Sequence, residues 1–210
     1  MRKKRFPAVR GRSAVARLNG RSAVVVYEAA QEIWEADDPA TFRSVIHTLK
    51  HGRSVLNRTA AAYALSLMHC KAAIPALEQT VDDKNEHPKV RGEAAESLAH
   101  NHRKRSHRVL LQNLNDPSKE VRFWCAFSLS EMGDCDALIS LRHLASSDHR
   151  IVGGFWSVSR EANAAIRIIR VNMRNKKRHA SRCLFCSKKW KKSVQTSPGS
   201  NKALSGAERP

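Results

Sequence analysis

One pattern of small and aliphatic residues recurs five times along this chain, at intervals of 31 to 37 residues. When the first residue of each copy is numbered 0, the residue at position +4 is small in every copy and the residue at position +8 is aliphatic. Positions 0, +4 and +8 lie on one face of an α-helix, so each copy predicts a helix with an apolar stripe that permits close approach of a neighbour. The copies begin at Val25, Asn57, Val90, Val121 and Val158.

A second apolar helix is predicted after each of the first four copies. In the turn "EMGDCDALISL", Gly133 suits the left-handed position that ends a helix, and "DDK", "NDP" and "SSD" stop the second helices. A single hairpin cannot bury its own apolar face, so stacked copies must supply the core. The predicted fold is all-α: a short right-handed α-solenoid of about four helix pairs plus a terminal helix, over residues 23–171.

The segments "RTAAAYALSLM", "VRGEAAESLAH" and "VRFWCAFSLSEMGDCDALISLRHL" resemble HEAT repeats, specifically the short kind found in phycobilisome-lyase-like proteins. The resemblance implies an ARM/HEAT-type superhelix, a fold that serves many roles. It favours a scaffold that binds another protein. Within this superfamily, "HPKVRGEAAESL" is most similar to deoxyhypusine hydroxylase, a di-iron enzyme whose repeats carry a His-Glu pair after the Arg. A bilin lyase is implied by analogy to the superfamily alone.

The His-Glu positions of that enzyme family are changed in this chain. Glu93 matches the Glu of one pair, but Gly92 stands where the His would be, and the flanking repeats have Thr59-Ala60 and Phe123-Trp124. Iron requires imidazole and carboxylate ligands, and Glu93 alone cannot hold two ions. We therefore expect no catalytic residue, no cofactor and no di-iron site, and we interpret Glu93 as a first-turn acid favoured by the helix dipole. A degenerate metal-dependent oxidoreductase is the enzymatic alternative.

The basic residues of the chain are concentrated at its two ends. Lys and Arg number 38 against 19 Asp and Glu, and residues 28–166 are nearly neutral. We expect residues 1–22 to be a disordered basic arm and residues 172–210 a disordered basic tail. Such ends favour, as an alternative function, nucleic-acid binding by counterion release without sequence readout.

Aromatic and basic side chains supply the candidates for contact with a partner protein. An exposed Trp is a strong anchor at an interface, and two aromatic pairs lie in the fourth copy and after a Gly-Gly insertion. The turn "HNHRKRSHR" adds a positive cluster that suits an acidic partner. The partner-binding candidates are Phe123, Trp124, Phe155, Trp156, Arg103, Lys104 and Arg105.

Cysteine usage bears on the compartment and on metal binding. The five Cys are an odd number and three lie in predicted helices, which favours reduced thiols and a cytoplasmic protein. In the tail, His179, Cys183 and Cys186 are the candidate zinc ligands, but they are one short of the usual four, so we expect no metal site there. No apolar run approaches the ~18 residues that a membrane-spanning helix requires.

Overall fold

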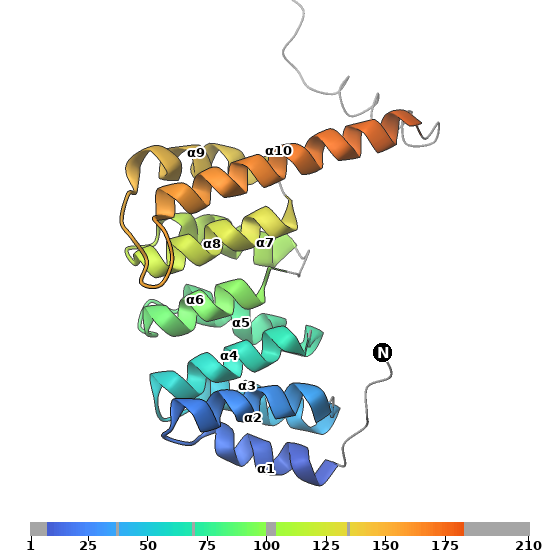
Figure 1. The fold of residues 1–210 in the computed structure, drawn as a ribbon, viewed down its shortest axis with the longest axis vertical. Helices are drawn as coiled ribbons and strands as arrows, with labels where there is room; N and C mark the ends of the chain where they lie inside the picture. Colours follow the sequence, from blue (N-terminus) through green and yellow to red (C-terminus); the bar gives the residue numbers. More distant parts are fainter. Residues whose placement is uncertain (1–7, 37, 69, 100–103, 134, 183–210) are drawn as a thin grey trace, which may run out of the picture. The chain divides into compact units, whose positions relative to one another are not determined.

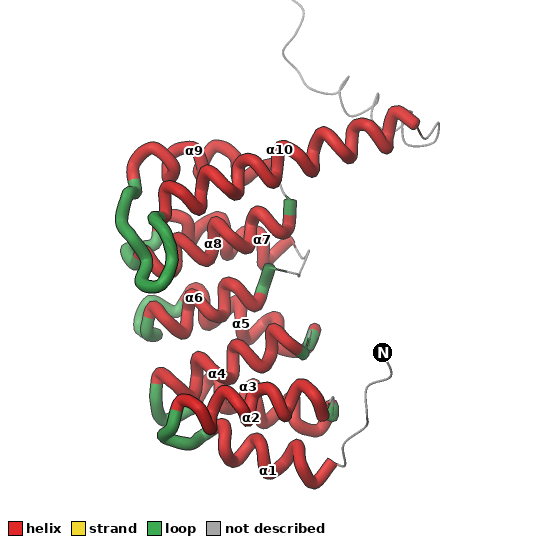
Figure 2. The backbone as a smooth tube through the Cα atoms, in the orientation of Figure 1, coloured by secondary structure: helices red, strands yellow, loops and turns green. Residues whose placement is uncertain are grey.

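The structure is a computed structural model that describes residues 8–36, 38–68, 70–99, 104–133 and 135–182. The chain divides into two compact units, Met1–Arg170 and Val171–Pro210, and the division falls within the last helix. No strand occurs in the described ranges, and the one β-type pairing among them is an isolated bridge between Ile151 and Ser157 (Figures 1 and 2). The α-helices of the described residues are α1 (Ala8–Leu18), α2 (Ala23–Ala36), α3 (Pro39–His51), α4 (Val55–Leu67), α5 (Ile74–Asp82), α6 (Pro88–Ser97), α7 (Lys104–Gln112), α8 (Lys119–Met132), α9 (Leu138–Ser147) and α10 (Val158–Arg182).

Within the first unit the helices form two rows. Each odd-numbered helix from α1 to α7 packs against the even-numbered helix that follows it, and α2, α4, α6 and α8 pack side by side in succession (Figure 1). This arrangement confirms the predicted all-α solenoid. No described helix is both long enough and apolar enough to cross a membrane.

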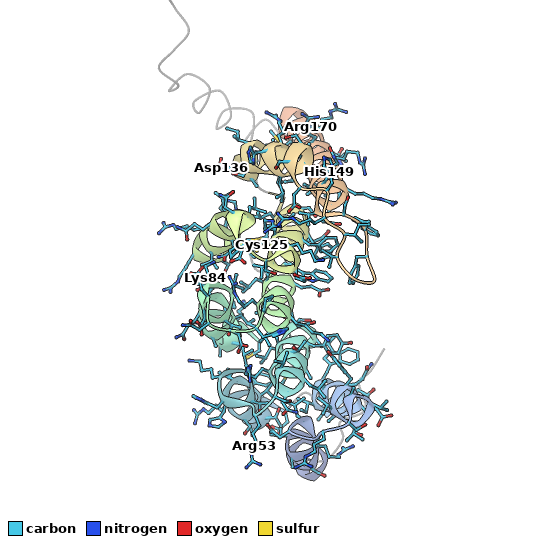
Figure 3. All side chains as sticks on the ribbon, turned by 90° about the vertical axis from the view of Figure 1, so that its left-hand side faces the viewer. Arg53, Lys84, Cys125, Asp136, His149 and Arg170 are labelled. Carbon is cyan, nitrogen blue, oxygen red and sulfur yellow. The ribbon has the colours of Figure 1, made fainter. Side chains whose placement is uncertain are left out.

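The repeated stripe forms the core between the rows. The residues at +4 are fully buried in all five copies: Ala29, Ala61, Ala94, Cys125 and Ala162. The aliphatic residues at +8 are buried as well: Ile33, Leu65, Leu98, Leu129 and Ile166. Figure 3 shows Cys125 among the side chains that fill the stack. The first copy differs at its start, because Val25 is 36% exposed.

Two hydrogen bonds show how closely neighbouring helices approach. The Ser97 hydroxyl of α6 donates to the Ala62 carbonyl of α4 over 3.0 Å, and the Ser128 hydroxyl of α8 donates to the Ala95 carbonyl of α6 over 2.8 Å. A side chain as short as serine reaches the next backbone only because alanines line the contact. At the end of α8, Gly133 adopts the predicted left-handed conformation with φ of 66°.

Three arginines join successive repeats. Each occupies the +1 position of an even-numbered helix and binds an acid that precedes the next such helix: Arg58 binds Glu86 through Nε at 2.6 Å, Arg91 binds Asp116 through Nη2 at 2.5 Å, and Arg122 binds Asp148 through Nε at 2.7 Å. We call this series the arginine ladder. Asp116 also accepts from Lys84 Nζ at 2.6 Å, and its backbone carbonyl accepts from Arg122.

The first predicted domain boundary differs from the observed helices, and the second falls inside α10, beside the division between the two compact units. Residues 8–18 form α1, whose Ala14 and Leu18 are fully buried, so the expectation of a disordered arm is wrong for this stretch. Helix α1 packs on α2 and adds a helix before the first predicted pair. At the other end, α10 continues to Arg182, beyond the predicted limit of 171. The remaining parts of the predicted arm and tail, 1–7 and 183–210, lie outside the described residues.

Candidate interaction face

The even-numbered helices present one series of side chains on their common face. These side chains lie at positions +2, +3 and +6 of the repeat, just beside the buried +4 position. Tyr27 of α2 and Tyr63 of α4 contact each other edge to face, with ring centroids 5.7 Å apart. Further along the row, Trp124 of α8 lies against Gly92 of α6. We call this surface the interaction face.

An aromatic cluster covers the α8 end of the interaction face. Its members are Phe123, Trp124, Phe127, Phe155 and Trp156. The Phe155 ring lies 5.1 Å from the Trp124 ring and 5.4 Å from the Phe123 ring, measured between centroids. The predicted insertion therefore folds back on α8. Phe123 is 2% exposed, so it is unavailable to a partner, whereas Phe155 and Trp156 are 47% and 41% exposed.

Charged side chains hold Trp156 in this cluster. Its indole nitrogen donates to Glu161 Oε2 over 2.8 Å, and the Arg160 guanidinium carbon lies 5.1 Å from the centroid of its ring. Burial raises the pKa of Glu161, and the hydrogen bond from Trp156 opposes that rise. These contacts fix the orientation of an aromatic surface that stays half open to solvent.

The positions that would hold iron in a hydroxylase do not fit a metal here. A β-carbon built at Gly92 would lie 2.7 Å from Cδ1 of Trp124, so the indole ring occupies the space of a side chain at this position. Thr59 turns its hydroxyl back to the Val55 carbonyl over 2.8 Å, and Ala60 is fully buried. Within the described residues, no three His, Cys, Asp or Glu side chains lie close enough together to form a metal site. We derive no reaction from this face.

Glu93 is the remaining acid of the hydroxylase-like pattern. Because α6 begins at Pro88, Glu93 lies in its second turn, and the interpretation as a first-turn acid is wrong. Burial and the neighbouring Glu96 raise the pKa of Glu93 to about 7, while Lys89 opposes the shift. Burial also raises the pKa of Tyr27, and the charge of Glu93 adds to that shift. Glu93 therefore acts on the tyrosine end of the interaction face.

The remaining candidates lie elsewhere. Lys104 begins α7, so the basic stretch predicted as a turn is helical from this residue. Arg105 is 71% exposed in its side chain and pairs with the buried Glu78 at 3.1 Å. Arg103, Cys183 and Cys186 lie outside the described residues, and for His179 only the helical backbone is described. The expected absence of a metal site in the tail and the nucleic-acid alternative both stay predictions.

A substitution at Gly92 tests the contact with Trp124. Alanine in a helix interior is normally better than glycine by about 0.8–1 kcal/mol. Here we expect Gly92→Ala to lower the free energy of unfolding by about 1–2 kcal/mol, because the added methyl group displaces the indole ring. In a Trp124→Ala background the same change should instead stabilise. Denaturant unfolding of the four proteins measures the coupling, and additive effects would contradict the contact.

Comparisons with known proteins agree with this architecture. Residues 84–153 match the family model of HEAT repeats, and residues 58–83 match that of the PBS lyase HEAT-like repeat. Deoxyhypusine hydroxylase of Arabidopsis thaliana is 41% identical over 75 residues, which cover 35% of this chain and 24% of that protein. The structure of human deoxyhypusine hydroxylase in complex with glycerol is similar with a TM-score of 0.51 and 25% identity, over 62% of this chain and 44% of that one.

The similarity is therefore strong in the repeats and partial in extent. This chain spans about a quarter of the curated hydroxylase and less than half of the solved one. The ranges that match the two repeat models contain Gly92, Thr59-Ala60 and Phe123-Trp124. The chain is thus shown to contain HEAT repeats, with one of the PBS lyase HEAT-like kind, and it resembles deoxyhypusine hydroxylases in both sequence and fold.

Proposed function

We propose that this chain is a non-catalytic scaffold that binds another protein through the aromatic cluster of its interaction face. The observation that carries this proposal is the contact of Trp124 with Gly92. An aromatic ring fills the space beside the position where the related enzymes carry a metal ligand. The same ring supports Phe155, so an apolar surface replaces a coordinating one.

The geometry of the cluster suits an anchor for a partner. Most binding energy at protein interfaces comes from a few large side chains, of which Trp is the most effective. Phe155 and Trp156 are already held by ring contacts and by Glu161, so they lose little conformational freedom when a partner binds. The guanidinium group of Arg160 lies beside Trp156 and adds a polar edge to this apolar surface.

We place the scaffold in the cytoplasm. Cys70 and Cys125 are buried free thiols, as expected in a reducing compartment. Burial raises the pKa of Cys125 far above its ordinary value, which keeps this thiol protonated and unreactive.

Site-specific photo-crosslinking of the full-length protein in cells tests the proposal. A photoreactive residue at Ile151, which is 67% exposed in the same loop, should crosslink one defined protein. The band should disappear in the Trp156→Ala variant, because the anchor is lost. A photoreactive residue at Ile139 of α9, which is 77% exposed, is the matched control and should not give this band.

Two results would contradict the proposal. The first is an Ile151 crosslink that Trp156→Ala leaves unchanged, since partner capture would then not depend on the cluster. The second is stoichiometric iron in the purified full-length protein, measured by elemental analysis, which would reopen the oxidoreductase alternative.

A further inference from the structure

A groove of about 600 Å³ lies at the α2 end of the interaction face, whereas the aromatic cluster lies at the α8 end of the same row of helices. Helices α2 and α4 supply its walls. Two tyrosines, one valine, three glutamates and one glutamine line it, and none of these residues is basic: Val24, Tyr27, Glu28, Gln31, Glu32, Glu35 and Tyr63.

The apolar part of the groove is formed by Tyr27 and Tyr63. Their rings meet at an interplanar angle of 68°, so the edge of one ring faces the other and part of each ring surface remains open to the groove. Val24 is 67% exposed at its rim. An exposed aliphatic side chain beside two half-buried aromatic rings is typical of a surface that another chain covers.

The acidic part of the groove follows one side of α2. Glu28, Glu32 and Glu35 are spaced by four and three residues, so their carboxylates lie in one line along the helix. Glu32 is paired with Arg17 of α1, and Glu28 and Glu35 are exposed.

We propose that this groove binds a segment of another protein in which Lys or Arg residues alternate with apolar ones. The aliphatic stem and cationic head of such a side chain match tyrosine rings beside carboxylates. The three glutamates of α2 form a local negative patch on a chain whose formal charge is +19. The net positive charge of the whole chain would repel a basic segment, so its binding would have to come from the groove itself. The same carboxylates disfavour nucleic acid at this place.

Fluorescence anisotropy with the full-length protein tests this inference. The probe is a labelled 12-residue peptide of alternating lysine and leucine. In Glu28→Gln/Glu35→Gln the dissociation constant of this peptide is expected to rise about tenfold, because two carboxylates are lost while side-chain volume is kept. The matched control, Asp83→Asn/Glu131→Gln, makes the same change in net charge at exposed positions of the α5–α6 turn and of α8, and should leave the constant within twofold.

A second pair of variants tests the contribution of the tyrosine rings that form the apolar part of the groove. Tyr63→Phe keeps the ring and should retain binding of the peptide, whereas Tyr63→Leu should weaken it about fivefold, because only the ring attracts the cation. Trp156→Ala should bind the peptide as the unchanged protein does, so failure of the groove is distinguishable from failure of the aromatic anchor. The inference is overturned if the basic peptide does not bind, if the charge control weakens binding as much as Glu28→Gln/Glu35→Gln, or if Tyr63→Phe and Tyr63→Leu behave alike.

Discussion

Replacing Arg91 with alanine is expected to lower the free energy of unfolding by about 3–5 kcal/mol, because the change leaves a buried carboxylate without its main partner. The Arg91 side chain is 3% exposed and that of Asp116 is fully buried. Arg91 also donates to the Val81 carbonyl through Nε at 3.0 Å. Burial alone would raise the pKa of Asp116, and the hydrogen bonds from Arg91 and Lys84 hold it below its ordinary value instead. Urea denaturation followed by circular dichroism measures the loss.

The matched control for this loss is Arg17→Ala. Arg17 also pairs with a glutamate of the next helix, but its side chain and that of Glu32 are 39% and 42% exposed. We expect a change of about 0–1 kcal/mol, the range typical of surface pairs. The double variant Arg91→Met/Asp116→Asn should recover part of the stability lost in Arg91→Ala. Equal losses for Arg91→Ala and Arg17→Ala would show that burial does not govern the strength of the ladder.

Ala94→Leu is expected to lower the free energy of unfolding by about 1–3 kcal/mol through overpacking. Ala94 is fully buried in α6, which packs against α4 on one side and α8 on the other. Three added carbon atoms have no space unless the helices separate, and separation would stretch the Ser97 and Ser128 hydrogen bonds. Thermal unfolding measures the effect.

The control for Ala94→Leu is Ala40→Leu, which makes the same change at an exposed position of α3. Its effect should stay within about 0.5 kcal/mol, as for most surface substitutions. An unchanged melting temperature in Ala94→Leu would mean that the +4 position of this repeat does not face a neighbouring helix.

The part of the fold that could be predicted is the part that a local pattern encodes. Positions +4 and +8 belong to one helix face, so sequence spacing alone placed Ala94 and Leu98 in the core. Gly133 was predictable for the same reason, since a left-handed helix end depends on one residue. Helix α1 was missed because its buried Ala14 and Leu18 lie in an arginine-rich stretch and do not follow the spacing of the repeat.

Contacts between repeats could not be derived from local spacing. The +1 arginines were visible in the sequence, but their partners were not, because Asp116 lies 25 residues beyond Arg91 and reads equally well as a helix stop. The burial of Phe123 depends on Phe155 and Trp156, which reach it from an insertion. The groove residues of α2 gave only a helical pattern, and the opposing Tyr63 comes from the next repeat. An acidic series at helical spacing beside one Tyr was the available signal.

The arginine ladder also sets how the array comes apart. The corresponding +1 residue of α2 is Val26, so no ladder arginine joins the first hairpin, α1–α2, to the next repeat. This hairpin is joined to α4 by neutral hydrogen bonds, such as those from the Asn57 amide to the Leu18 and Gly20 carbonyls at 3.0 and 2.8 Å, whereas at the other end Arg122 binds Asp148 just before α10. Under tension or during amide exchange, the first hairpin should open before the ladder-bound middle. The groove between α2 and α4 straddles the joint between a loosely held hairpin and that middle. A segment bound there would act as a clamp across the joint, and it would extend the rigid part of the array by one hairpin.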